Sequence, residues 1–234
     1  MSGILYGLGV GPGDPELMTL KAVRTIREND VIALPGEEPR ETTAFKIAVQ
    51  AVPELAEKEL IPMHFPMVMD RREQNESHCK GAKSLEKILD SGKNVVFLTL
   101  GDVTVYSTFT YIQHFVKADG YKVELINGIP SFCAAAATLG IPLAEWTQPL
   151  HIIPASHSLG QPLAQPGTYV LMKSGSKMKD VKVKLGSSDR DVFMVENCGM
   201  PDEKCYHSLD EIPDDAGYFS LIITKEKTPG YDVE

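Results

Sequence analysis

Residues 7–14 read GLGVGPGD, and this glycine-rich turn follows directly on the apolar stretch Ile4–Leu8. Such a run predicts a short buried strand ending in a tight loop, whose backbone N–H groups can approach a ligand closely. Apolar residues then recur every three positions between residues 17 and 26 and predict an amphipathic helix, with Asp14 and Pro15 as its start signal. A strand, a glycine turn and a helix in this order are typical of the opening unit of an α/β fold.

The rest of the first half continues the alternation of strand and helix. Further strands are predicted at residues 31–34, 60–61, 94–100 and 122–126. The helices between them are expected at residues 42–52 and 70–90 and along the apolar stripe formed by Tyr106, Phe109, Ile112 and Phe115. Strands separated by helices indicate βαβ units, so we expect an N-terminal α/β domain, residues 1–127, around a mostly parallel five-stranded sheet.

The second half has fewer predicted helices between its predicted strands. A break at Gly128-Ile129-Pro130-Ser131 is followed by an alanine-rich helix over residues 132–139. Candidate strands lie at residues 151–154, 169–172, 192–196 and 219–224, with one clear helix at 177–185. Because few helices separate these strands, we expect a C-terminal α/β domain, residues 128–234, with a mixed and partly antiparallel sheet.

Composition limits the classes of partner. The net charge of −9 argues against a nucleic-acid binder, which usually shows a basic surplus. Neither a signal peptide nor an apolar run long enough for a membrane helix is visible, so we expect no membrane partner and a cytoplasmic location. The four cysteines form no C-x-x-C pair and are expected to be free thiols. A metal site made of Cys198, Cys205 and His207 has no supporting cluster, so no metal is expected.

The turn at residues 7–14 does not fit the common nucleotide motifs. In the pattern G-x-G-x-x-G the third glycine would fall on Pro12 or Asp14, and no acidic residue ends the second strand at Leu34-Pro35-Gly36. No G-x-x-x-x-G-K-[ST] occurs. A nucleotide-binding oxidoreductase is therefore disfavoured. By itself, the turn is also compatible with a purely structural strand-to-helix connection.

Two further loops follow predicted strands. Residues 99–108 read TLGDVTVYST, in which Gly101 permits close backbone approach and Asp102 either caps the next helix or meets a polar ligand. Ser131 either caps the alanine-rich helix or faces the same site. Because ligands of open parallel sheets bind at the carboxyl ends of the strands, the three loops are candidates for one site.

Together, the three loops resemble the tetrapyrrole (uroporphyrinogen-type) methylase family. Residues 7–22, GLGVGPGDPELMTLKA, match the opening signature of that family, and Gly101-Asp102 with Tyr106 matches its G-D-P-x-x-Y motif. Gly128-Ile129-Pro130-Ser131 matches a third turn, with Ile126-Asn127 in place of Val-Pro. Order and spacing agree over nearly the whole chain. One departure is Val103, where many members carry proline.

Within that family, two stretches resemble the branch that methylates carbon 20 of precorrin-2 or cobalt-precorrin-2 during cobalamin biosynthesis. They are residues 101–112, GDVTVYSTFTYI, and Phe65-Pro66-Met67 followed by Asp70-Arg71. The alternatives are a methyltransferase of the same fold that acts on another corrin precursor or on uroporphyrinogen III, and a non-catalytic tetrapyrrole carrier.

The resemblance implies two α/β domains with S-adenosyl-L-methionine in the cleft between them and S-adenosyl-L-homocysteine as product. Carried over residue by residue, the cofactor contacts are Pro12, Leu100, Gly101, Asp102, Val105, Tyr106, Ser131, Phe132, Met172, Asn197, Cys198 and Thr224. Met172 has an alternative role as core filler. Tyr106 or Asp102 is a catalytic candidate, because a proton leaves after methyl transfer.

The resemblance also implies a small-molecule tetrapyrrole substrate and a homodimer. The substrate carries carboxylates, so cationic side chains are expected beside it. The candidates, each of which has an alternative as a solvated surface charge, are Lys21, Arg71, Arg72, Lys173 and Lys177. Should the substrate carry a metal, His64, His78 and His157 could approach it, although each is expected at the surface or in a loop.

Overall fold

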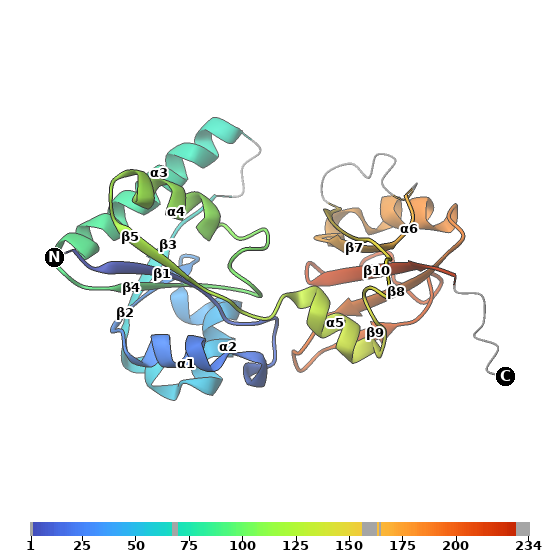
Figure 1. Ribbon diagram of the computed structural model, residues 1–234, viewed down its shortest axis with the longest axis horizontal. Coiled ribbons are helices and arrows are strands. Elements are labelled where there is room, and N and C mark those ends of the chain that lie inside the picture. The colour runs from blue at the N-terminus through green and yellow to red at the C-terminus, as the bar shows by residue number, and fades with distance from the viewer. Residues whose placement is uncertain (1, 67–69, 156–162, 164, 228–234) are drawn as a thin grey trace. The chain divides into compact units, whose positions relative to one another are not determined.

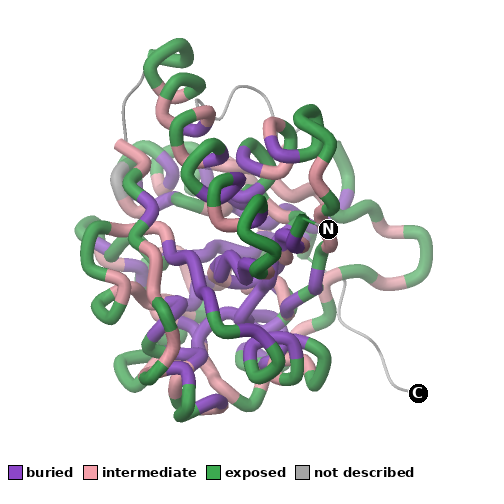
Figure 2. Tube along the Cα trace, turned by 90° about the vertical axis from the view of Figure 1, so that its left-hand side faces the viewer, coloured by how far each residue is buried: buried purple, intermediate pink, exposed green. Residues whose placement is uncertain are grey.

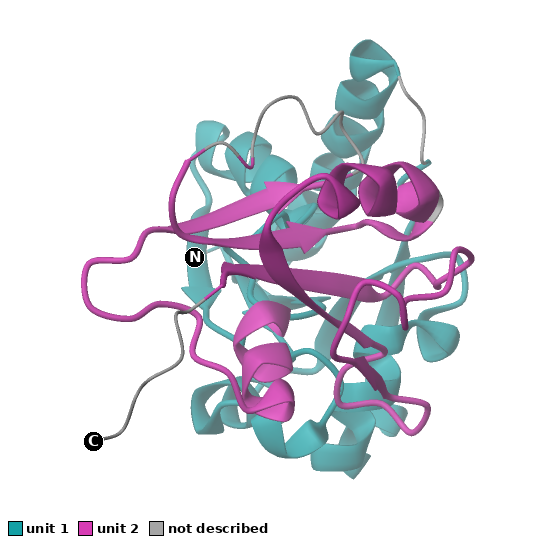
Figure 3. Ribbon diagram, turned by 90° about the vertical axis from the view of Figure 1, so that its right-hand side faces the viewer, with its two compact units in different colours: residues 1–130 teal, residues 131–234 magenta. Residues whose placement is uncertain are grey.

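The computed structural model describes the chain except for residues 1, 67–69, 156–162, 164 and 228–234. It divides into two compact units, Met1–Pro130 and Ser131–Glu234, coloured teal and magenta in Figure 3. Each unit is built around its own five-stranded sheet. Among the described residues, no helix combines the length and the apolar character needed to cross a bilayer.

Unit 1 alternates strands and helices (Figure 1). Its main elements are β1 (Ile4–Gly9), α1 (Leu20–Arg27), β2 (Val31–Pro35), α2 (Thr43–Ala51), β3 (Glu59–Met63), α3 (Arg71–Asp90), β4 (Val95–Thr99), α4 (Phe109–Ala118) and β5 (Lys122–Ile126). The strands are parallel and lie in the order β3-β2-β4-β1-β5. The predicted parallel five-stranded sheet is therefore confirmed.

The strand order creates a switch point between β1 and β4. The connection through α1 leads from β1 past β4 to β2, whereas the connection through α4 leads from β4 past β1 to β5. In Figure 1, α1 and α2 lie on one side of the sheet and α3 and α4 on the other. The loops after β1 and β4 consequently diverge, and such a divergence at the carboxyl ends of strands is where open α/β sheets bind ligands.

Side-chain alternation along the strands gives unit 1 two cores. One joins strand residues such as Leu8 and Leu98 to α1 and α2, and the other joins residues such as Phe97 to α3 and α4. Figure 2 shows buried strands in the centre and exposed turns around them. Strands buried on both faces explain why residues 95–98 are uninterruptedly apolar.

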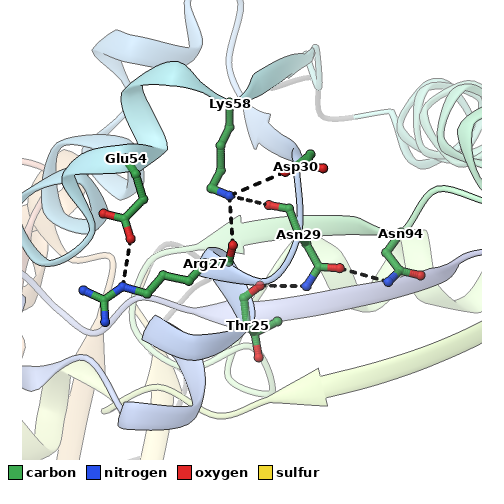
Figure 4. A network of polar contacts seen from close by, with 7 residues as sticks. All are labelled: Thr25, Arg27, Asn29, Asp30, Glu54, Lys58 and Asn94. Carbon is green, nitrogen blue, oxygen red and sulfur yellow. Dashed lines mark hydrogen bonds and ion pairs between the residues drawn. The ribbon is translucent and has the colours of Figure 1, made fainter.

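A polar network closes the amino end of this sheet (Figure 4). Lys58 Nζ donates to the backbone oxygens of Arg27, 3.1 Å away, and Asn29, 2.9 Å away, and so satisfies carbonyls at the end of α1. Asn94 Nδ2 donates to Asn29 Oδ1 over 2.9 Å, and Asn94 Oδ1 accepts from the N–H of Ile4 over 2.8 Å. The network fixes the end of α1 to the starts of β1 and β4.

Two predicted helix starts in unit 1 were wrong. Asp14 and Pro15 begin a 3-10 turn, η1 (Pro15–Leu17), and α1 begins only after Thr19, whose hydroxyl accepts from the N–H of Ala22. Tyr106 does not belong to the helical stripe, because α4 begins at Phe109. In both places a loop lies between the strand and its helix. These are two of the three loops that the sequence predicts for the site.

Unit 2 contains the mixed sheet that was predicted. Its main elements are α5 (Ser131–Leu139), β6 (Leu150–Pro154), β7 (Thr168–Met172), α6 (Met178–Gly186), β8 (Arg190–Glu196), β9 (Lys204–Tyr206) and β10 (Ser220–Glu226). The strand order is β6-β7-β10-β8-β9, with β6 parallel to β7 and the other pairs antiparallel. Strand β9 was not predicted, because three residues of mixed polarity carry no alternation signal.

Candidate active site

Three loops meet at the carboxyl ends of β1, β4 and β5. Gly11 N–H donates to the Gly101 oxygen over 3.1 Å, and Gly101 N–H donates to the Gly11 oxygen over 2.7 Å. A Cβ atom added at Gly9 or at Gly128 would lie closer than 3.0 Å to the carbonyl oxygen of Gly101. Glycine is therefore required here by direct backbone packing, and the three predicted loops form one continuous backbone surface.

Asp102 ties the second loop to the third. Its Oδ1 accepts from the N–H of Thr104 over 2.8 Å and from the Thr104 hydroxyl. Its Oδ2 accepts from Asn127 Nδ2 over 3.2 Å and from the N–H of Gly128 over 3.0 Å. The alternative role as cap of the next helix was wrong, since Thr108 holds the N-cap position of α4.

The Asp102 carboxylate is held in its charged form. It is only 5% exposed, and burial by itself raises the pKa of the carboxyl. The hydrogen bonds from Thr104, Asn127 and Gly128 outweigh burial and lower the pKa of Asp102 below its ordinary value. A carboxylate that accepts four hydrogen bonds has little capacity left for a further proton.

The loop between Asp102 and α4 carries a strained tyrosine. Tyr106 has a φ of 47°, a left-handed conformation uncommon for residues other than glycine, and its side chain is 45% exposed. The hydroxyl of Ser107, by contrast, is buried and lies 3.1 Å from Thr99 Oγ1 and 3.2 Å from the N–H of Phe109. Ser107 thus anchors the loop beside the partly exposed Tyr106, and a left-handed backbone at a residue other than glycine is found preferentially at functional sites.

The other predicted contacts fall in both units. Pro12 is buried in the loop after β1, and Leu100 and Val105 are half-buried in the loop after β4. Ser131 and Phe132 open α5 in unit 2, so Ser131 is the first helical residue rather than its cap. Phe132 is buried.

In unit 2, Met172 and Asn197 lie at the same end of the sheet, where β7 and β8 finish. Strands β7 and β8 are both antiparallel to β10, so their carboxyl ends point the same way. Lys173 and Asn197, directly beyond the two ends, have φ values of 59° and 54°. Asn197 N–H donates over 3.1 Å to the oxygen of Phe219, just before β10. Two residues with a left-handed backbone therefore lie at one end of this sheet.

Cys198 and Thr224 have different surroundings. Cys198 is 8% exposed, its Sγ lies 4.0 Å from Thr138 Oγ1, and burial raises the pKa of its thiol to about 11. Thr224 is fully buried, pairs in register with Tyr169 and accepts from Arg190 Nε over 3.1 Å. Cys198 therefore lies at the same end of the sheet as Asn197. Thr224 lies farther from that end, since its partner Tyr169 precedes Met172 by three residues on β7.

The candidate cationic and imidazole side chains are scattered. Lys21, Arg71, Arg72, Lys173 and Lys177 are all exposed. His64 is exposed and 3.2 Å from a carboxylate oxygen of Glu37, whereas His78 is 8% exposed within α3, so its expected surface position was wrong. His157 lies outside the described residues. Across the described part of the chain, no three His, Cys, Asp or Glu side chains gather as a metal site would require.

The sequence profile of the family described as Tetrapyrrole (Corrin/Porphyrin) Methylases matches residues 4–213, which include all three loops. The chain belongs to this family.

Several relatives within the tetrapyrrole methylases are similar over nearly their full length. A protein of Methanocaldococcus jannaschii named "Probable cobalt-precorrin-2 C(20)-methyltransferase" is 35% identical over 94% of this chain and 95% of its own. The cobalt-precorrin-2 C(20)-methyltransferase of Salmonella typhimurium is 31% identical over 97% of this chain and 98% of its own. The precorrin-2 C(20)-methyltransferase of a Sinorhizobium species is 28% identical over 95% and 97%.

Solved structures share the fold. The uroporphyrin-III C-methyltransferase of Thermus thermophilus, complexed with S-adenosylhomocysteine, superposes with a TM-score of 0.70 at 23% identity, covering 95% of this chain and 92% of that one. The two-unit architecture is thus that of tetrapyrrole methylases.

Two departures from the family motifs have structural roles. Asn127, in place of the family's proline, donates its amide to Asp102 and thereby adds a link between two loops. Val103, where many tetrapyrrole methylases carry proline, is 1% exposed and packs in the core beneath α3 and α4. Sequence reasoning missed the contribution of Asn127, Thr104 and Ser107, because their roles depend on contacts between loops.

Proposed function

We propose that this protein transfers a methyl group from S-adenosyl-L-methionine to carbon 20 of precorrin-2 or cobalt-precorrin-2 in cobalamin biosynthesis. The observation that carries the proposal is the 28–35% identity, over nearly the whole length, to relatives named for that reaction. The family motifs are matched by three loops, Gly7–Asp14, Gly101–Thr108 and Gly128–Ser131.

The glycine loops fit such a cofactor. Their backbones pack so closely that side chains are excluded at Gly9 and Gly128, which leaves main-chain groups as the contacting atoms. We assign cofactor contacts in unit 1 to Pro12, Leu100, Gly101, Asp102, Val105 and Tyr106, and in unit 2 to Ser131, Phe132, Met172, Asn197, Cys198 and Thr224. Of these, Thr224 has the least support, because its hydroxyl is buried against Arg190.

When bound, S-adenosyl-L-methionine supplies an electrophilic methyl group on its sulfonium. The protein's own contribution is then mainly to hold two reactants in line and to exclude water. We propose that Asp102 acts by fixing the loops, since its carboxylate accepts four hydrogen bonds. Tyr106, strained and exposed, is the better candidate to meet the acceptor or its departing proton. Unchanged turnover in Tyr106→Phe would remove its hydroxyl from that role.

Anaerobic turnover tests the function. Purified protein is incubated with methyl-labelled S-adenosyl-L-methionine and precorrin-2, its cobalt complex or uroporphyrinogen III, and the label is located by NMR. Label at carbon 20 supports the proposal, and the faster acceptor identifies the physiological form of the substrate. Label found only on uroporphyrinogen III would show that the alternative function, methylation of uroporphyrinogen III, is correct. Cofactor binding by calorimetry without any labelled product would favour a carrier.

We further propose a cytoplasmic homodimer. All four cysteines are free thiols, as is usual in a reducing compartment. Large apolar side chains stand in solvent on both units, including Leu20 at 89% exposure and Trp146 at 101%, and such residues often cover an interface. Light scattering should give twice the chain mass of 25.7 kDa, and cell fractionation should place the protein in the cytosol.

A further inference from the structure

The two stretches that resemble the carbon-20 branch meet in space. Phe65 from one stretch and Tyr111 from the other are 46 positions apart in sequence, yet both contact the ring of His78. The Phe65 and His78 ring centroids are 5.4 Å apart, and those of His78 and Tyr111 are 4.8 Å apart. One residue of each stretch therefore joins His78 in an aromatic cluster, formed by Phe65, His78 and Tyr111.

The cluster supports one exposed tyrosine from below. The rings of His78 and Tyr111 are stacked with an interplanar angle of 2°, and His78 is 8% exposed whereas Tyr111 is 56% exposed. Burial lowers the pKa of His78, so this ring is neutral at pH 7 and stacks as an aromatic group. Phe65 in turn packs against the core residue Phe97, with 6.4 Å between the two ring centroids. One face of Tyr111 is thus supported from the core, and the residue remains half open to solvent.

Tyr111 follows the candidate loop in the chain, and Arg71 lies on the helix of its stacking partner His78. The N–H of Tyr111 donates to the oxygen of Thr108, so it stands in the first turn after the loop that carries Asp102 and Tyr106. Arg71 and His78 are seven residues apart on α3 and therefore share a face, separated by about 10 Å along the axis at about 1.5 Å per residue. Arg71 is exposed. An exposed aromatic ring and an exposed guanidinium on two neighbouring helices suit a macrocycle that bears carboxylates at its rim.

We infer that Tyr111, supported by His78 and Phe65, packs against the face of the tetrapyrrole acceptor and helps to select it, with Arg71 meeting a peripheral carboxylate. The inference rests on the proposed function and extends it to residues outside the cofactor loops. His78 is a positioning residue in this arrangement, because Tyr111 separates it from the acceptor.

The test compares Tyr111→Ala with Tyr111→Phe under the anaerobic turnover conditions. Loss of one aromatic stacking surface should raise KM for the tetrapyrrole roughly 10- to 100-fold in Tyr111→Ala, with little change in kcat or in cofactor affinity by calorimetry. Tyr111→Phe should keep KM near the wild-type value. Val183→Ala shortens a side chain that is 75% exposed on α6 and is assigned to neither the site nor the interface, and it serves as the control, for which KM should not change.

His78 provides an independent arm. His78→Phe keeps a ring beneath Tyr111 and should preserve KM, whereas His78→Ala should raise it. An unchanged KM in Tyr111→Ala, measured in a preparation whose wild type labels carbon 20, would overturn the inference and leave the proposed function intact. A wild type that labels no tetrapyrrole would instead overturn the proposed function, and the inference with it.

Discussion

The carboxylate of Asp102 accepts a hydrogen bond of 3.0 Å from the backbone N–H of Gly128, although 26 positions separate the two residues in the chain. The bond joins the loop after β4 to the loop after β5. Gly101, next to Asp102, is bonded in turn to Gly11 in the loop after β1. One carboxylate therefore helps to hold the surface to which the cofactor contacts of unit 1 are assigned.

Replacing Asp102 by Asn should weaken both the fold and the site. An amide cannot accept at all the positions where the carboxylate does, so the Gly128 N–H or the Asn127 amide loses its acceptor. Hydrogen bonds to a charged group contribute about 1.5–3 kcal/mol each, and we expect a loss of that order in unfolding free energy, together with weaker cofactor binding. Urea denaturation and calorimetry measure the two effects.

The effect of Asp102→Asn should depend on pH in one direction. Because the folded-state pKa of Asp102 is lowered from 3.8, its contribution is present above that value and disappears as pH falls through the lower, folded pKa. The stability difference between wild type and variant should thus be constant near neutrality and shrink below about pH 4. Asp70→Asn is the control, since Asn caps a helix as well as Asp. Equal losses of unfolding free energy in Asp102→Asn and Asp70→Asn would argue against the role of Asp102 in joining the loops.

Gly128→Ala should disrupt the three-loop surface. The added methyl group would lie closer than 3.0 Å to the backbone of Gly101 and Gly9, neither of which has a flexible side chain to move aside. Overpacking of this kind costs about 1–3 kcal/mol, and we expect cofactor affinity to fall with it. Gly186→Ala, whose methyl group would make only an ordinary contact with Leu209, should keep or slightly raise stability. Unimpaired cofactor binding in Gly128→Ala would contradict the assignment of this surface.

Local patterns in the sequence were sufficient for most of the fold. Residues 95–98 are apolar without interruption, which predicted the buried strand β4, and the helix predicted at residues 42–52 corresponds to α2, residues 43–51. The patterns failed where a loop carries helix-like signals. Asp14 and Pro15 are a valid helix start, but here they start only the 3-10 turn η1, and the chain makes a second start at Thr19. Sequence spacing alone cannot distinguish one such start from the other.

The three loops of the site could also be predicted, because each follows a strand and carries glycine. Their mutual contacts could not. The bond from Asn127 to Asp102 and the stack of His78 on Tyr111 join residues on different elements, and no periodicity in the chain relates them. His78 was expected at the surface for the same reason: its burial depends on Phe65 and Tyr111, which lie outside its own helix.

Lys58→Met should destabilise unit 1 at the end distant from the site. The Lys58 side chain is 10% exposed, and its ammonium group donates to two carbonyls at the end of α1. Without it, these carbonyls lose a charged donor, and we expect a cost of about 1.5–3 kcal/mol in urea denaturation. Lys46→Met removes a lysine whose ion pair with Glu41 is exposed, and should have no measurable effect. Loss of turnover in Lys58→Met at temperatures where it remains folded would contradict a purely structural role.

Cys198 should react more slowly with alkylating reagents than the exposed Cys205. Burial raises the pKa of the Cys198 thiol to about 11, so at about pH 8 only on the order of one molecule in a thousand carries the reactive thiolate. Mass spectrometry after timed treatment with iodoacetamide gives the order of reaction. Since the folded pKa lies above the ordinary value of 9.0, the thiol contributes stability that is complete below about pH 9 and is lost as pH rises toward 11. Cys198→Ala should not lose stability in this way as pH rises. If Cys198 were instead the first cysteine to be alkylated in the wild type, the end of the sheet at Asn197 would be open to solvent.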